Sequence, residues 1–427
     1  MSGAPERIQE RIRRVAGLLR DAERPVRILR TVSWDPEVRE RFFADGEREL
    51  PVVTYHPFDP AATLACVAEA RRLATGDSDI DRWLRRQAES IELGARMLAA
   101  VGTADLYRMS AEIYGTPMSP LADQSSTSLD LARALDRTLD AARGVDLGPE
   151  GVVDAVEIAS RVTRAVDRHF GERAPRVTID EHLSANALAG TDAIRIRRGA
   201  RFTDRDAVQL IHHEAFVHVG TSLAGRAQDD LPILAAGHAG TTRTQEGLAV
   251  FAEFISGAID PDRLDRLADR VLAIQMAIDG ADFLEVYHFF VERTGDREQA
   301  FENARRVFRG GVLTGGAPFT KDVVYLDGLL RVHNFLRAAV AAGRSDCLRL
   351  LFVGKIDIED IPALCHLSEM GMVRRPEFLA PWAVDLRFLV AYLAYSGFLN
   401  QVDLDKIRVH YVDMLEGAPP VSFARPL

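Results

Sequence analysis

The stretch "IHHEAFVHVG", residues 211–220, carries the strongest structural and chemical signal in this sequence. One histidine, His213, is followed directly by Glu214, and a second histidine, His218, comes five residues after the first. Zinc peptidases commonly carry H-E-x-x-H on a helix, where a spacing of four puts both histidines on one face. At 100° per residue, four residues separate two side chains by about 40° and five by about 140°. A regular helix would therefore point these two imidazoles apart.

A local irregularity would bring the two histidines together again. One extra residue in a helical turn, a π-bulge, returns residues five apart to the same face, and such bulges cluster at functional sites. We therefore predict an irregular turn within residues 214–218. His213 and His218 could then share one Zn²⁺, which takes histidine and carboxylate ligands and leaves a position open for water in catalytic sites. Glu214 would be the general base, because a metal acidifies water and a carboxylate takes its proton.

A third ligand is expected from the next helix, "TTRTQEGLAVFAEFISG", residues 241–257. Glu246 lies early in this helix, 28 residues after His218, and Glu253 follows seven residues later. Residues seven apart share a helix face, so either glutamate could be the ligand. Glu246 could also be only a charge that the helix dipole favours near an N-terminus.

Composition restricts the class of protein. Of 427 residues 47% are apolar, which is ample material for a core, and the formal net charge is −10. The sequence pI of about 5.6 argues against a nucleic-acid partner, which would require a basic face. Three widely spaced cysteines provide neither a disulfide framework nor a C-x-x-C metal pair, so we expect reduced thiols.

The chain has no recognisable targeting or membrane signal. Its first 24 residues are charged every few positions and lack the apolar core of a signal peptide. No run reaches the roughly 18–20 apolar residues of a membrane span. We expect a cytoplasmic protein with no membrane partner; nothing in the sequence indicates its oligomeric state.

Hydrophobic periodicity predicts a mainly helical α+β protein. Two short stretches, 176–180 and 193–197, alternate apolar and polar residues and are expected to be strands of a small sheet just before the histidine helix. "MSPLADQSSTS", 118–128, is typical of a linker and suggests an N-terminal, mostly helical region at 1–120 and a catalytic region at 121–427. Helices are expected at 6–22, 61–76, 79–101, 103–114, 127–143, 151–170, 204–221, 242–257, 260–279, 281–294, 297–309, 321–341, 344–352, 378–396 and 402–415.

The motifs "HHEAFVH" and "TQEGLAVFAEF" resemble a known family, the bacterial flavohemoglobin expression-modulating QEGLA-motif proteins. That family is similar to the eukaryotic microtubule-associated tyrosine carboxypeptidases, which carry the same stretched H-E-x-x-x-H, and dipeptidyl peptidase III has a similar motif. "FRGG" at 308–311 and "FTKDVVYLDGLL" at 319–330 also look like family landmarks. The resemblance extends over residues 30 to 415 and is densest over 205–335. It implies that the catalytic region, 121–427, is zincin-like, with His213, His218 and Glu246 as zinc ligands and Glu214 as the base.

A carboxypeptidase also needs a cation for the C-terminal carboxylate of its substrate, for which arginine provides a bidentate fork and lysine a point charge. The candidates close to the motifs are Lys321, Arg243, Arg306 and Arg309. Lys321 follows "GGVLTGGAPFT", whose four glycines could let the backbone approach a ligand or move as a lid, although a plain flexible turn is an equal alternative.

Other side chains could stabilise the oxyanion that forms when hydroxide attacks a carbonyl. Tyr325 follows Lys321 by four residues, so the two can face one side, and a tyrosine hydroxyl can serve this role. His238 and His333 could act likewise, whereas His212 is expected to be structural. The strand "AIRIRR", 193–198, is a candidate edge strand whose free backbone groups could pair with an extended peptide.

The function best supported by these residues is a zinc metallopeptidase that releases a C-terminal residue from a peptide or protein. In this interpretation Glu214 and Tyr325 are catalytic, Lys321, Arg243 and His238 bind substrate, and His213, His218 and Glu246 bind Zn²⁺. Two alternatives remain, a zinc amidase acting on a small amide and a regulatory protein whose metal is structural or absent. A deep narrow pocket would favour the first alternative, and a closed four-ligand metal site the second.

Overall fold

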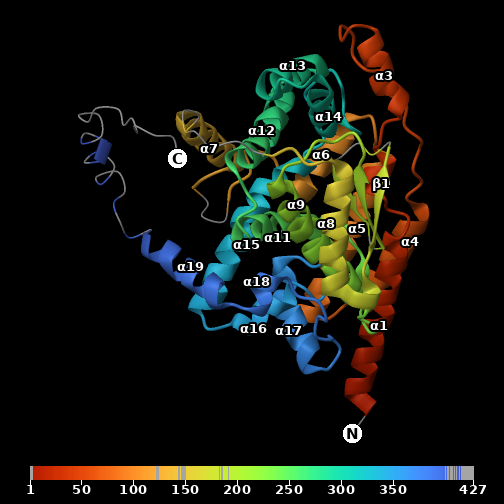
Figure 1. The fold of residues 1–427 in the computed structure, drawn as a ribbon. Coiled ribbons are helices and arrows are strands. Elements are labelled where there is room, and N and C mark those ends of the chain that lie inside the picture. Colours follow the sequence, from red (N-terminus) through yellow and green to blue (C-terminus); the bar gives the residue numbers. More distant parts are fainter. Residues whose placement is uncertain are drawn as a thin grey trace.

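The computed structural model describes residues 3–399, except for 122–124, 143–144, 146–150, 182, 184–185 and 191, together with isolated positions between 401 and 414. Helices make up most of it, with one small sheet at the side (Figure 1). The α-helices are α1 (Gly3–Glu23), α2 (Ile28–Thr31), α3 (Pro36–Ala44), α4 (Ala61–Leu73), α5 (Asp79–Ala99), α6 (Ala104–Tyr114), α7 (Ser128–Ala142), α8 (Ala155–Phe170), α9 (Asp204–Leu210), α10 (Gly220–Arg226), α11 (Thr242–Ile255), α12 (Pro261–Ile278), α13 (Phe283–Thr294), α14 (Arg297–Phe308), α15 (Val324–Ala341), α16 (Ser345–Leu350), α17 (Ile361–Glu369), α18 (Pro381–Val384) and α19 (Arg387–Leu399).

Shorter helical turns join several of these helices. One is a π-helix, η2 (Ile211–Val219), which lies between α9 and α10. The others are 3-10 turns, namely η1 (Gly171–Arg173), η3 (Pro232–Ala235), η4 (Ala239–Thr241), η5 (Lys321–Val323) and η6 (Ile358–Asp360).

The predicted α+β class is confirmed, and most predicted helices are present. Three short helices, α2, α3 and α17, were not predicted. The helix predicted at 402–415 lies partly outside the described residues, but positions 407, 409, 411, 412 and 414 are described and helical. Within the described part of the chain, no helix combines the length and apolar character needed to cross a membrane.

The small sheet contains β1 (Arg176–Asp180), β2 (Ala187–Ala189) and β3 (Ala193–Arg197) in the spatial order β1-β3-β2. β1 runs parallel to β3, with Arg176 opposite Ala193, and β2 runs antiparallel to β3. The alternating pattern of β3 reflects its burial, because Ile194 and Ile196 are fully buried while Arg195 between them is exposed. Helix α8 packs against β1 and β3.

One sequence-based expectation about this sheet is wrong. β3, which contains "AIRIR", is the central strand, so its backbone groups are already paired on both sides. The edge strand that contacts η2 is β2, a three-residue strand too short to show an alternating pattern. Any pairing of an extended peptide with this sheet beside η2 therefore concerns β2.

The core joins the two ends of the described chain. The largest buried apolar cluster includes Ile12 and Leu19 of α1 as well as Leu389 and Leu393 of α19. A second cluster, rich in aromatic side chains, fills the space between α3, α13 and α14. The division into regions 1–120 and 121–427 stays a prediction, although the largest cluster draws residues from both sides of it.

Candidate metal centre

The predicted irregular turn is present, and it is a complete π-helix. η2 spans Ile211–Val219 and contains both histidines of the motif. Bonding from residue i to i+5 widens the turn, so residues five apart lie above one another. The imidazole rings of His213 and His218 are consequently neighbours, with centroids 4.9 Å apart and planes at 83°. The stretched spacing thus puts both histidines on one face of the helix.

Side chains also donate hydrogen bonds to backbone carbonyls at the end of the π-helix. Ser222 Oγ donates to His218 O at 2.7 Å, and Thr221 Oγ1 lies 2.7 Å from Val217 O. Lys355 Nζ donates to His218 O and to Thr221 Oγ1, both at 2.9 Å. An unpaired buried carbonyl would cost about 1–3 kcal/mol, so these donors stabilise the π-helix.

The helix that carries the QEGLA sequence crosses α15 at unusually short range. A Cβ atom added at Gly247 would lie 2.2 Å from the carbonyl carbon of Gly328, and one added at Gly328 would lie 2.4 Å from Arg243 O. Only glycine fits such a backbone contact. The crossing brings Glu246, the residue before Gly247, next to the start of α15.

Glu246 faces both histidines. Its Oε2 lies 3.5 Å from His218 Nε2 and 3.8 Å from His213 Nε2. In the described part of the chain, these three residues form a group whose potential ligand atoms all lie within 4.8 Å of one another. A tetrahedral site with bonds of about 2.0–2.1 Å requires ligand atoms about 3.4 Å apart. Two imidazole nitrogens and a carboxylate oxygen therefore fit one divalent cation such as zinc.

The alternative ligand Glu253 occupies a different position. Its Oε1 accepts a hydrogen bond of 2.6 Å from Nδ1 of His213, on the side of the ring away from Glu246. Arg263 holds the same carboxylate with two hydrogen bonds of 2.8 Å, from Nε to Oε2 and from NH2 to Oε1. Because a carboxylate only accepts, Nδ1 carries the proton and Nε2 keeps its lone pair for a metal. Glu253 thus orients the histidine, as carboxylates commonly do in zinc sites.

Electrostatics favour the ionised form of Glu246 and the neutral form of His218, as metal binding requires, but they also favour protonation of His213, and a metal would displace that proton from Nε2. Burial would raise the pKa of Glu246, but Lys321 and then His218 hold it well below its ordinary value. Burial alone would lower the pKa of His213, but the hydrogen bond and charge of Glu253 raise it. Burial lowers the pKa of His218, and Glu246 only partly offsets this. The carboxylate is therefore ionised in the absence of any metal.

Glu214 lies beside this group and is held by the edge of the sheet. The backbone N–H of Ala189, in β2, donates to Glu214 Oε2 at 3.0 Å. The other oxygen, Oε1, is 3.9 Å from His213 Nε2, and the side chain is 15% exposed. One oxygen is thus anchored while the other faces the candidate metal position and solvent.

Lys321 and Tyr325 lie on the far side of Glu246 and contact each other, as their spacing of four predicted. Lys321 Nζ is 3.1 Å from Glu246 Oε1 and donates to Tyr325 OH at 3.3 Å. The lysine side chain is only 6% exposed, and burial would lower its pKa, but Glu246, Tyr325 and Asp322 raise it. Its charge therefore already has a partner in Glu246.

Comparison with known proteins identifies the family of the chain. The sequence profile of the microtubule-associated tyrosine carboxypeptidase family matches residues 40–401, which include the three candidate ligands and Glu214. The chain belongs to this family. A search of curated proteins gives no match.

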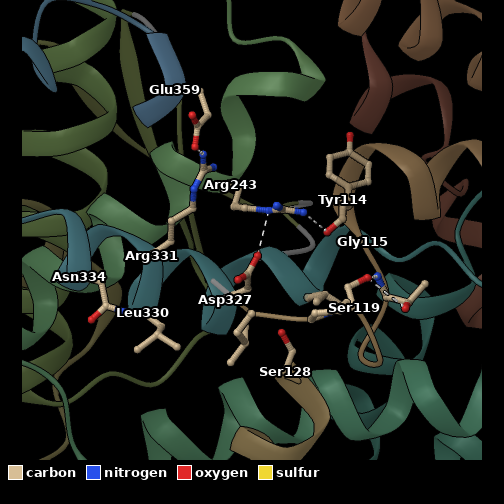
Figure 2. A pocket seen from close by; sticks show the side chains of 14 residues that line it. Tyr114, Gly115, Ser119, Ser128, Arg243, Asp327, Leu330, Arg331, Asn334 and Glu359 are labelled. Carbon is tan, nitrogen blue, oxygen red and sulfur yellow. Dashed lines mark hydrogen bonds and ion pairs between the residues drawn. The ribbon is translucent and has the colours of Figure 1, made fainter. Parts of the chain in front are cut away.

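In this member of the microtubule-associated tyrosine carboxypeptidase family, Arg243 is turned toward another cavity (Figure 2). Its NH2 donates to Tyr114 O at 2.9 Å, and its Nε lies 2.9 Å from Asp327 Oδ2. The cavity measures about 250 Å³ and is lined by residues of the α6–α7 connection, α11 and α15, none of them a candidate metal ligand. The predicted contact of Arg243 with substrate therefore finds no support in its present partners.

The three other histidines considered in the sequence have protein partners. His238 is buried, with Nε2 2.5 Å from Gln87 Oε1 and Nδ1 3.1 Å from Ser90 Oγ, and burial lowers its pKa to about 4. His333 Nε2 lies 3.1 Å from Tyr392 OH. His212 packs against Phe216, as expected for a structural residue. Both ring nitrogens of His238 have protein partners, so its present contacts give no support to the predicted contact with substrate.

Three important side chains were not singled out from the sequence. Arg263 holds Glu253, Lys355 holds the π-helix, and Arg270 lies over the ring of Tyr325 at 4.8 Å. Arg306 and Arg309, which were candidates, lie close to Arg270, since all three form ion pairs with Asp322. These contacts join helices that are far apart in sequence, so no local pattern marks them.

Proposed function

We propose that this chain is a zinc-dependent carboxypeptidase that releases the C-terminal residue of a peptide or protein. The observation that carries the proposal is the convergence of His213 Nε2, His218 Nε2 and one oxygen of Glu246 on a common point, with Glu214 alongside. Membership of a carboxypeptidase family supports a peptide or protein substrate. Zinc suits this ligand set better than magnesium or calcium, which prefer oxygen ligands throughout.

A bound zinc ion would acidify a water molecule and polarise the carbonyl of the scissile bond. Glu214 would take the proton from that water with the oxygen that the sheet leaves unbound, and would return it to the leaving amine. Lys321 would hold Glu246 in its ionised state and Glu253 would hold the His213 ring in place.

Tyr325 would stabilise the negative charge that develops on the carbonyl oxygen. Its hydroxyl oxygen accepts from Lys321 Nζ at 3.3 Å and from Arg306 NH2 at 3.4 Å. Both lone pairs are thus occupied, and the hydroxyl hydrogen is available to a substrate oxygen. Edge strand β2 would align the substrate, because a peptide can add to a free strand edge through backbone hydrogen bonds.

The family name includes tyrosine and microtubules, but the residues of this site do not select either substrate. We expect a cytoplasmic enzyme, which agrees with its three free cysteines. A peptide mixture with varied C-terminal residues, digested by the zinc-loaded protein and read by mass spectrometry, would identify the residue released.

Replacing Glu214 by glutamine tests the proposal. We expect Glu214→Gln to keep one zinc ion per chain and to lose hydrolysis by about 10²–10⁴-fold, the usual contribution of a general base. Zinc content is measured by elemental analysis and hydrolysis by release of free amino acid. A matched control is Glu92→Gln, since Glu92, on α5, is 19% exposed and pairs with Arg71 of α4 and Arg96 of α5, neither of which contacts a candidate ligand. Unchanged turnover in Glu214→Gln would remove Glu214 from the mechanism.

A further inference from the structure

A group of buried cations next to the candidate metal centre has too few anions to balance it. Asp322 has four positive neighbours in the described structure. Arg306 Nε is 2.5 Å from its carboxylate, whereas Arg270, Arg309 and Lys321 lie at 3.8, 3.9 and 4.0 Å. Lys321 is balanced by Glu246, and Arg306 has the short pair with Asp322. This leaves Arg270 and Arg309 with only long ion pairs, of 3.8 and 3.9 Å, to a carboxylate that they share with Arg306 and Lys321.

The same cations surround the ring of Tyr325. Arg270 and Lys321 each lie 4.8 Å from the ring centroid, and Arg306 lies 5.9 Å from it. Cations are attracted to an aromatic face, but this attraction does not neutralise them. The ring therefore holds Arg270 in place without satisfying its hydrogen-bond donors.

Burial makes the unbalanced charge significant. The side chains of Arg270 and Arg309 are 17% and 14% exposed, and Arg309 Nε is buried with no hydrogen-bond partner in the described structure. Burial, followed by the neighbouring Arg306, lowers the pKa of Arg270 and of Arg309 to about 10. Both remain charged at neutral pH, so the site is arranged to receive an anion.

We propose that Arg270, assisted by Arg306 and Arg309, binds the C-terminal carboxylate of the substrate. The inference rests on the proposed peptidase function and replaces Lys321 and Arg243 as the expected anchors. Lys321 is engaged with Glu246, and Arg243 with Asp327 and Tyr114. A guanidinium presents a planar fork of donors that matches a carboxylate.

The position of the arginines agrees with release of residues from the chain end. A chain of three contacts joins the metal centre to the arginines. Glu246 Oε1 lies 3.1 Å from Lys321 Nζ, which lies 3.3 Å from Tyr325 OH, and this hydroxyl lies 3.4 Å from Arg306 NH2. A residue of extended chain spans about 3.3–3.6 Å. The guanidiniums therefore lie within a few residues' length of the metal centre, and a carboxylate bound there belongs to the segment just beyond the scissile bond. An internal peptide segment would bring no main-chain carboxylate to this place.

Binding to an inactive variant tests the inference without depending on turnover. Zinc-loaded Glu214→Gln protein is equilibrated by dialysis with N-acetylated tripeptides of varied last residue, as free acids and as C-terminal amides, and the retained peptides are measured by mass spectrometry. We expect retention of the acids over the amides. Adding Arg270→Met should weaken acid binding by about 10- to 100-fold, the usual effect of hydrogen bonds to a charged group, and leave the amides unchanged. Arg270→Lys keeps the charge but loses the planar pair of donors. Its affinity for the acids should therefore lie between that of the Glu214→Gln protein and that of the protein with Arg270→Met added.

Arg293→Met is the matched control. Arg293 is 23% exposed, pairs with Asp136 and Asp269, and lies 5.4 Å from the ring of Phe289, so it resembles Arg270 but belongs to a different cluster. Equal retention of acids and amides, no retention of either, or an unchanged preference in the Arg270 variants would each overturn the inference. Hydrolysis by the unmodified enzyme is measured separately. If acids bind through Arg270 but nothing is cleaved, the proposed function fails and the carboxylate site stands. If peptides are cleaved without preference for acids, the carboxylate site fails and the peptidase activity stands.

Discussion

Replacing Glu253 by glutamine tests how the protein holds its candidate metal ligands. Glu253 is completely buried and makes three short hydrogen bonds, one of 2.6 Å to His213 and two of 2.8 Å to Arg263. Glutamine has the same shape but no charge, so the buried guanidinium of Arg263 loses its partner. Breaking a buried ion pair on one side typically costs about 3–5 kcal/mol of stability. Loss of the carboxylate beside a zinc-binding histidine typically weakens metal affinity by about 10–100-fold.

Two assays separate these effects. Zinc affinity is measured by competition with a chelator of known affinity, and stability by urea unfolding of the metal-free protein. Glu302→Gln is a matched control, because Glu302 is also buried and pairs with an arginine, Arg305, but lies on α14 away from the histidines. We expect only Glu253→Gln to weaken zinc binding. Equal zinc affinity in Glu253→Gln and the unmodified protein would refute the orienting role of Glu253.

The pH dependence of stability provides an independent check on the same residue. Burial would raise the pKa of Glu253, but Arg263 and His213 hold it below its ordinary value of 4.5. A depressed carboxylate pKa contributes stability that is fully present above the unfolded pKa and is lost as the pH falls. The metal-free protein should therefore lose stability more steeply below about pH 4.5 than Glu253→Gln does.

Two further substitutions examine the scaffold. Gly247→Ala should destabilise the protein by about 1–3 kcal/mol, because the new Cβ would lie 2.2 Å from the backbone of Gly328. Gly17→Ala, in an open part of α1, should be neutral or stabilising. The free energy of unfolding of both variants is measured by chemical denaturation. Lys355→Met removes the donor to His218 O and should weaken zinc binding by about tenfold, measured by chelator competition; unaltered affinity would show that the π-helix needs no such support.

The unusual turn could be predicted because the metal-binding residues of the motif do not share a face on a regular helix. H-E-x-x-x-H cannot bind one ion on a regular helix, so a functional motif requires a wider turn, and η2 confirms it. The contact between Lys321 and Tyr325 followed from their spacing of four residues. Such local arguments extend only over a few residues of one helix.

Contacts between distant elements could not be predicted in the same way. Glu246 and Glu253 share a helix face, and only the packing of η2 against α11 shows that they approach opposite nitrogens of His213. The prediction that β3 is an edge strand was wrong, because the short strand β2, which lies outside it, has no recognisable sequence pattern. Arg270 escaped notice because its partners, Asp322 and Tyr325, lie some fifty residues further along the chain.

The most direct test of the central claim is a crystal structure of the zinc-loaded protein with anomalous data collected at the zinc edge. One anomalous peak is expected at about 2.0–2.2 Å from His213 Nε2, His218 Nε2 and a carboxylate oxygen of Glu246, with a fourth position open toward Glu214. A zinc ion bound elsewhere, or one closed by four protein ligands, would contradict the proposed catalytic site.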